Sequence, residues 1–236
     1  MPTIDREKRL VEEVATPYSE SQFAVLRYIR DQGFTECPEP IEIKDGKEYV
    51  SYVEGTDLSH MSAEDRNKAD ELLVNVCMQW KRLVEVSESF DYRSSDQLTL
   101  PPTMHDDYIG TVPCHLDLNP GNVVLDPDGK INFIDFRNTS LSTPQYDLAL
   151  FIRHWGPFAP PKDRLEEFQD LNSLSRFDLV CDEVGLSHPQ RTELAQALIK
   201  SYDKSLEMRG PDNPSYVEKN RRAQRWGANI LRSYLE

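Results

Sequence analysis

The sequence has no long apolar run. None of its 236 residues lies in a stretch that approaches the ~18 apolar residues of a membrane-spanning helix. The opening segment, MPTIDREKRLVEEV, carries charges where a secretory signal peptide has its apolar core. We therefore expect a cytoplasmic protein that does not interact with membranes.

Cysteines are few and scattered. They form no CxxC pair, and no histidine lies at the spacing of a zinc ligand set. Isolated cysteines in a cytoplasmic protein are usually reduced thiols rather than disulfides or metal ligands. We predict that the thiols are free and mostly buried; they belong to Cys37, Cys77, Cys114 and Cys181.

Cations are scarce relative to acids. Lys and Arg number 27 against 41 Asp and Glu, which gives a formal charge of −14. Because affinity for nucleic acid comes mostly from cations that neutralise phosphates, we expect no nucleic-acid partner. The acidity suits a cationic small molecule, although many cytosolic proteins are acidic for solubility alone.

The first half of the chain alternates between helical and strand-like patterns. Apolar residues recur at helical spacing over 19–33, behind a serine cap and before a glycine stop. Residues 41–43 and 48–53 alternate on either side of an Asp-Gly turn and predict a hairpin, with 9–14 as a further strand. A long helix is predicted within 63–90 and a loop over 91–110.

The second half contains another hairpin and then helices. Two short apolar runs, 122–125 and 130–134, flank Asp126-Pro-Asp-Gly129, a sequence typical of a turn. From residue 144 the pattern is helical, interrupted by segments rich in proline. The predicted helices span 144–155, 163–184 with a break, 188–208 and 214–235.

Three oxygen-bearing side chains flank the second hairpin. Asp117 and Asn122 precede it and Asp135 follows it, so the hairpin can bring Asn122 and Asp135 together. Magnesium prefers such ligands, and phosphoryl transfer also needs a carboxylate that orients the attacking hydroxyl. A single Asp in a loop is usually a turn or capping residue, but the whole set favours this chemistry.

This segment resembles a known family of enzymes. His115-x-Asp117-x-x-x-x-Asn122, followed by a hairpin and Ile134-Asp135-Phe136, is similar to the catalytic and metal-binding loops of the aminoglycoside phosphotransferase and choline kinase family. The similarity extends to Pro144-Gln-Tyr-Asp147 and to Tyr52-Val-Glu-Gly55, and covers roughly residues 14–205. It implies an α+β, protein-kinase-like fold with a reduced N-terminal β lobe, 1–54, and a mainly helical catalytic lobe, 55–236.

The resemblance also implies roles for individual residues. Asp117 would orient the acceptor hydroxyl and take its proton, and His115 would brace the catalytic loop, unless it is only a satisfied core residue. Asn122 and Asp135 would bind magnesium (Mg2+) on the phosphates of ATP. Asp147 would anchor the loop structurally.

The front of the chain departs from the family pattern. The first glycine is Gly33, so no glycine-rich loop precedes the first helix, and the strand before that helix holds Glu12 and Glu13 but no lysine. Glu20 fits an ordinary first-turn acid better than the partner of a lysine. Arg137, two residues after Asp135, either replaces a phosphate contact or lies on the surface.

Two functions remain open from the sequence. The leading one is a small-molecule kinase that transfers the ATP γ-phosphoryl group to a hydroxyl of a small acceptor, possibly amine-bearing. The alternative is a kinase-like pseudoenzyme that binds a nucleotide, metabolite or protein partner. The acidic residues of the later helices would either line the acceptor site or form solvated faces; the candidates are Asp178, Asp182, Glu183 and Glu193.

Overall fold

The chain folds into two compact units. The computed structural model describes residues 2–60, 62, 68–92, 99–101, 106–164, 169–209 and 213–236. Unit 1 consists of 1–60, 79–103 and 109–143, and unit 2 of 61–78, 104–108 and 144–236. Helix α3 (Ala69–Ser87) runs through both units. The boundary expected between residues 54 and 55 stays a prediction.

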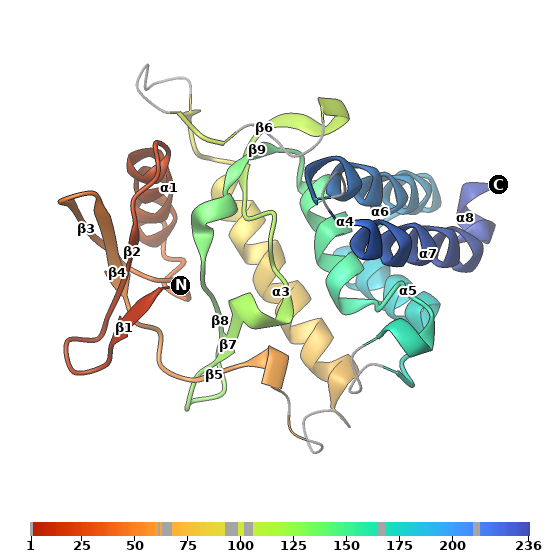
Figure 1. Cartoon of the computed structure of the whole chain (residues 1–236), viewed down its shortest axis with the longest axis horizontal. Helices are drawn as coiled ribbons and strands as arrows, with labels where there is room; N and C mark the ends of the chain where they lie inside the picture. Colours follow the sequence, from red (N-terminus) through yellow and green to blue (C-terminus); the bar gives the residue numbers. More distant parts are fainter. Residues whose placement is uncertain are drawn as a thin grey trace. The chain divides into compact units, whose positions relative to one another are not determined.

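Unit 1 begins with an antiparallel sheet of four strands in the order β1-β2-β4-β3 (Figure 1). The strands are β1 (Thr3–Asp5), β2 (Leu10–Val14), β3 (Pro40–Lys44) and β4 (Lys47–Ser51). Asp45 and Gly46 join β3 to β4 with φ of 53° and 74°, the backbone of a tight hairpin turn. The predicted hairpin and the strand at 9–14 are confirmed, whereas β1 was not predicted.

Helix α1 (Ser19–Asp31) packs beside this sheet (Figure 1). Its buried apolar face includes Phe23, Leu26 and Ile29, which confirms the predicted helix. The predicted serine cap is wrong: Tyr18 stands at the N-cap without a side-chain bond. Ser19 is the first residue of the helix rather than its cap, and its hydroxyl donates to the carboxylate of Glu48, so that each of these two buried side chains has a partner.

The rest of unit 1 contains two smaller sheets. One consists of β5 (Thr56–Asp57), β7 (Val123–Leu125) and β8 (Ile131–Phe133), so the predicted second hairpin is confirmed. The other pairs β6 (Ile109–Cys114) with β9 (Ser140–Ser142). The loop predicted over 91–110 is therefore wrong at its end, where Gly110 and a register shift interrupt strand alternation. Residues 93–98 and 102–105 of that prediction lie outside the described part.

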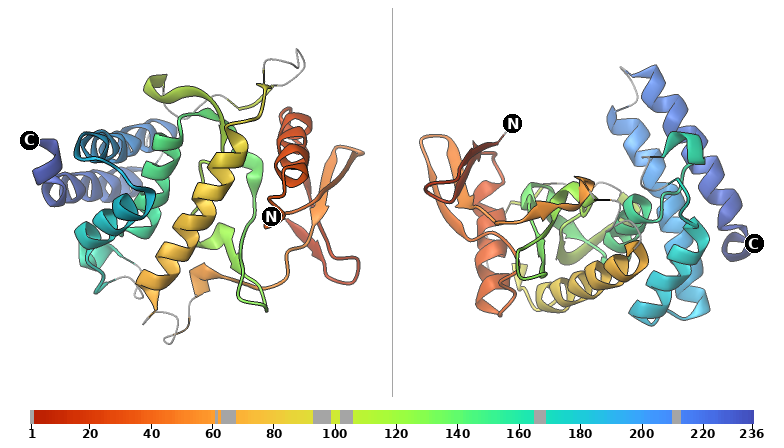
Figure 2. Two further views of the ribbon diagram at one scale, coloured as in Figure 1. Left: turned by 180° about the vertical axis from the view of Figure 1, so that it is seen from behind. Right: turned by 90° about the horizontal axis from the view of Figure 1, so that it is seen from below.

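Unit 2 is helical (Figure 2). Arg153 of α4 donates to the Ser201 carbonyl, the Ser205 hydroxyl and the Asn220 side chain, and thereby connects three helices. The helices are α4 (Pro144–Trp155), α5 (Ser173–Val184), α6 (His188–Arg209), α7 (Pro214–Ile230) and α8 (Arg232–Leu235).

Three of the four helices predicted here are close to the observed ones, and one start is wrong. Helix α5 begins at Ser173, not near residue 163, because the side chain of Asn172 accepts the Ser175 N–H and caps it there. Residues 165–168 lie outside the described part. Within the described residues, no helix is both long and apolar enough to cross a membrane. All four cysteines are buried, as predicted.

Candidate active site

His115 connects two segments of the candidate site. It follows β6, is 1% exposed, and lies edge-on to the ring of Phe136 at 4.5 Å. Its Nε2 is 3.0 Å from the Ile134 carbonyl, and its Nδ1 accepts the Asp117 N–H at 3.3 Å. Both bonds are satisfied together only by the neutral ring with the proton on Nε2. His115 thus links the loop of Asp117 to the end of β8.

Asp117 projects from this loop with both carboxylate oxygens hydrogen-bonded. Asn119 donates to Oδ1 and Asn138 donates to Oδ2, each at 2.9 Å. Leu116, just before it, has φ of 62°, which turns the chain out of β6. Each carboxylate oxygen can accept a second hydrogen bond. Asp117 is therefore oriented by two amides and still able to accept a hydroxyl proton.

Asn122 lies at the start of the β7–β8 hairpin, close to both aspartates. It ends a short 3₁₀ turn, Pro120–Asn122, that the Asn119 side chain caps. Its Nδ2 donates to the Asp117 carbonyl at 2.8 Å, and its carbonyl accepts the Ile134 N–H at 3.0 Å. The structure therefore connects Asn122 to Asp117 and to the residue that precedes Asp135, and its role as a magnesium ligand stays a prediction.

Asp135 follows β8 in a left-handed conformation, with φ of 59°. Its Oδ1 accepts from Arg137 Nε at 2.8 Å and its Oδ2 from Arg137 Nη2 at 3.0 Å. Burial raises the pKa of Asp135, but the hydrogen bonds and charge of Arg137 outweigh this and leave the pKa below its usual range. A non-glycine residue held at positive φ is often found at a functional site.

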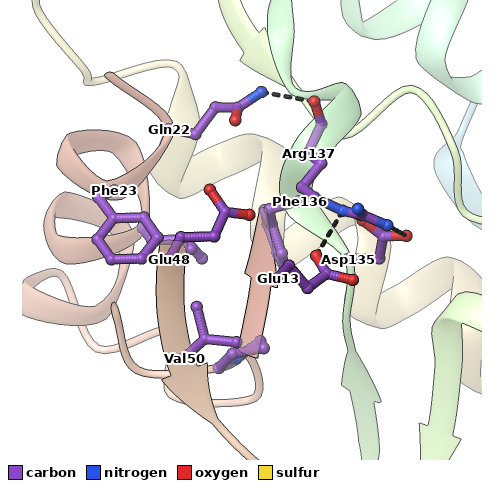
Figure 3. Close-up of a pocket in the computed structure, with 10 residues that line it drawn as sticks. Glu13, Gln22, Phe23, Glu48, Val50, Asp135, Phe136 and Arg137 are labelled. Carbon is purple, nitrogen blue, oxygen red and sulfur yellow. Dashed lines mark hydrogen bonds and ion pairs between the residues drawn. The ribbon is translucent and has the colours of Figure 1, made fainter. Parts of the chain in front are cut away.

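Arg137 stands among carboxylates (Figure 3). Besides Asp135, its Nε lies 2.7 Å from Oε2 of Glu13 in β2. Glu13 and Glu48 are directly opposite each other across β2 and β4, an arrangement that is unfavourable for like charges. Burial raises the pKa of Glu13, and the charge of Arg137 opposes that rise. The backbone of Arg137 is held by Gln22 of α1, whose Nε2 donates to its carbonyl at 2.5 Å.

A cavity of about 290 Å³ opens beside these residues, within unit 1. One part of its wall is apolar and the other is polar, with Gly121 and Asn122 next to Asp135 and Arg137. Such a combination, and a volume near ~300 Å³, is typical of a small-molecule site. The apolar part of the wall includes Val11, Val50, Val53 and Ile134.

Sequence reasoning missed Glu13 as part of the site and left the role of Arg137 open. Only the strand register shows that Glu13 and Val11 share the face of β2 that lines the cavity. The upstream cations lie elsewhere: Lys8 pairs with Asp5, and Arg9 with Glu54 at 3.5 Å.

The site offers few protein ligands for magnesium. No group of three or more His, Cys, Asp or Glu side chains that could hold a metal occurs in the described residues. Magnesium needs fewer protein ligands when phosphates supply the rest, commonly one or two carboxylates. The Asp135 carboxylate with the Asn122 amide oxygen fits that requirement, provided that Arg137 releases at least one oxygen of Asp135.

Of the acidic candidates for an acceptor site, three already have partners inside unit 2. Arg191 Nη2 lies 2.5 Å from Asp182, and Tyr234 donates to Asp178 at 2.6 Å. Glu193 accepts from Gln145 at 3.2 Å. Their role toward an acceptor stays a prediction, as does the anchoring role of Asp147, which is buried in the first turn of α4.

Comparison with solved structures identifies the fold as the protein-kinase-like α+β fold. A choline/ethanolamine kinase family protein from Mesorhizobium loti is 14% identical, with a TM-score of 0.61, over 94% of this chain and 82% of the other. An ethanolamine kinase from Plasmodium vivax is 10% identical, with a TM-score of 0.60, over 99% and 80%. Aminoglycoside phosphotransferase APH(2'')-Ib, solved with ADP, is 11% identical, with a TM-score of 0.56, over 95% and 88%.

The family comparison agrees with the structural one. Residues 97–179 match the model of the phosphotransferase enzyme family. This matched segment contains Asp117, Asn122 and Asp135. A search of curated proteins gave no significant match. The resemblance to the aminoglycoside phosphotransferase and choline kinase family, and the fold that it implied, are confirmed.

Proposed function

We propose that this protein is an ATP-dependent phosphotransferase that acts on a hydroxyl group of a small, amine-bearing acceptor. The observation that carries the proposal is that Asn122 and Asp135 line one cavity of about 290 Å³, and that the Asn122 side chain is hydrogen-bonded to the backbone of Asp117. The match of residues 97–179 to a phosphotransferase family supports it independently.

The nucleotide base would occupy the apolar part of the cavity wall. Val11 and Val50 come from paired positions on β2 and β4, and Ile134 directly follows β8 of the β7–β8 hairpin. Among the described residues, neither the N–H nor the C=O of Val53 makes a hydrogen bond. These two groups are free to bind the edge of a purine. APH(2'')-Ib, which has the same fold, was solved with ADP.

The phosphates would lie at the polar end of the cavity. Asn122 and Asp135 would hold magnesium there, and the ion when bound supplies positive charge to the β- and γ-phosphate oxygens. Asp135 is suited to this because both of its carboxylate oxygens already face a cation, the Arg137 guanidinium. Asn122 adds a neutral oxygen and keeps the hairpin in register through the Ile134 N–H.

Asp117 would act on the acceptor. Asn119 and Asn138 fix the plane of its carboxylate, so that an acceptor hydroxyl can donate to a remaining lone pair. The hydroxyl oxygen forms a bond to the γ-phosphorus, the bond from that phosphorus to the β,γ-bridging oxygen breaks, and the hydroxyl proton passes to Asp117. His115 holds the loop of Asp117 to the segment that carries Asp135. The −14 charge favours an acceptor that carries an amine.

Two charge-removing variants test the proposal. Asp135→Asn should abolish magnesium-dependent ADP binding and turnover together, because the phosphates lose the ligand of their counterion. Asp117→Asn should leave ADP binding nearly unchanged and slow turnover at least ~100-fold. Asp128→Asn, which changes an exposed carboxylate in the turn of the same hairpin, is the matched control and should change neither.

The measurements are ADP titration calorimetry with and without magnesium, and ATP consumption over a panel of amino alcohols, aminoglycosides and neutral sugars. Turnover confined to neutral sugars would contradict the amine-bearing acceptor but not the kinase. Magnesium-dependent ADP binding without turnover on any acceptor would favour the pseudoenzyme. ADP binding that is equal in wild type and Asp135→Asn would overturn the assignment of the site.

A further inference from the structure

Arg137 is the one positive charge on the wall of the nucleotide cavity, counting the described residues. The same wall carries the carboxylates of Glu13 and Asp135, and Glu48 is close enough to add its charge. A triphosphate would add more negative charge to a region that is already acidic. Binding therefore requires cations, and the only cationic side chain among the described residues of the wall is the Arg137 guanidinium.

Both the backbone and the side chain of Arg137 are held in place. Gln22 fixes its backbone carbonyl, and Glu13 and Asp135 hold its guanidinium at 2.7–3.0 Å. Within the described residues, Nη1 makes no hydrogen bond, and 41% of the side chain is exposed. An arginine held through Nε and Nη2 can still present its remaining N–H groups to a phosphate.

Glu13 occupies a position where a cation would be expected. In protein kinases a strand lysine reaches the phosphates and pairs with a helix glutamate. Here β2, the strand that precedes α1 in the chain, presents Glu13 to the cavity, and the exposed first-turn acid Glu20 is not among the residues that line it. The strand therefore supplies a carboxylate in place of a lysine, and the cation that pairs with it comes from the segment after Asp135.

We propose that Arg137 is a phosphate-binding residue that replaces the strand lysine, with Glu13 as its anchor. This inference rests on the proposed nucleotide site. When magnesium binds Asp135, Arg137 gives up that carboxylate, keeps Glu13, and donates to the nucleotide phosphates. The Asp135–Arg137 pair thus represents the site before magnesium binds, when the guanidinium occupies the place that the metal ion takes.

The test separates phosphate binding from a role in folding. Affinities of wild type and Arg137→Ala for ADP and for adenosine are measured by calorimetry in magnesium. Arg137→Ala should weaken ADP binding about 10- to 100-fold, as expected for loss of a charge-assisted arginine–phosphate contact, and should leave adenosine binding within about twofold. Arg82→Ala is the matched control: Arg82 is 49% exposed and pairs with Glu36 at 3.2 Å, away from the cavity.

A relocated charge provides the second arm of the test. Glu13→Lys combined with Arg137→Ala returns a cation to the strand and should recover at least tenfold of the lost ADP affinity. A purely structural role of Arg137 would predict no recovery, because the double variant lacks the original ion pair.

Each outcome decides the inference. Equal loss of ADP and adenosine affinity in Arg137→Ala would show that the side chain shapes the cavity, and would overturn the inference while the nucleotide site stands. Unchanged ADP affinity, or a double variant no better than Arg137→Ala, would also overturn it. Wild type that binds neither ligand would refute the proposed function itself. If Arg137→Ala fails to fold, Arg137→Gln provides the same comparison.

Discussion

Replacement of His115 by leucine would test how the candidate site is held together. The change removes two hydrogen bonds, one to the Ile134 carbonyl at 3.0 Å and one from the Asp117 N–H at 3.3 Å. A buried polar group without a partner costs about 1–3 kcal/mol. The longer bond contributes at the lower end of that range, so we expect His115→Leu to lower the free energy of unfolding by about 2–4 kcal/mol.

The assay is urea unfolding followed by circular dichroism and tryptophan fluorescence. His188→Leu is the control: His188 is exposed at the start of α6, and its replacement should cost less than about 0.5 kcal/mol. His115→Gln, which offers a donor and an acceptor, should recover part of the loss. Equal stability of the two leucine variants would refute the idea that His115 connects the Asp117 loop to β8.

Two further predictions concern single side chains. Asn138→Ala removes the amide that donates to Oδ2 of Asp117, and should lower kcat about 5- to 50-fold with ADP affinity unchanged, measured by steady-state kinetics and calorimetry. Burial raises the pKa of Cys37 and of Cys181 to about 12, so only ~10⁻⁴ of each thiol is ionised at pH 8. Iodoacetamide should therefore label both only after urea is added, and rapid labelling of either in the native protein, detected by peptide mass spectrometry, would contradict its burial.

The parts of the fold that the sequence predicted are those with strong local signals. The Asp126-Pro-Asp-Gly129 turn and the Asp45-Gly46 turn each determine a hairpin within a few residues. The 19–33 helix was visible because its buried side chains repeat at the helical period. By contrast, β1 and β9 have only three residues each, too few to show alternation.

The residues of the candidate site likewise fall into those that a local sequence pattern predicts and those that it does not. Asp117, Asn122 and Asp135 lie within one short segment whose hairpin can be read from the sequence. The pairing of Glu13 with Arg137 joins residues far apart in the chain and depends on the order of strands in the sheet, which no local pattern encodes. Side chains that meet only through tertiary register could not be predicted from one sequence.

The proposed nucleotide site implies that reagents which label kinases through a lysine would not label the described wall of this cavity. Acyl-phosphate derivatives of ATP transfer their acyl group to an amine near the phosphates. The described residues that line the cavity include no lysine, and the guanidinium of Arg137 stays protonated and is a poor nucleophile. A survey of cell extracts with such reagents would therefore miss the chain if it binds nucleotide as proposed, whereas Glu13→Lys would place a reactive amine in the cavity and make the protein visible.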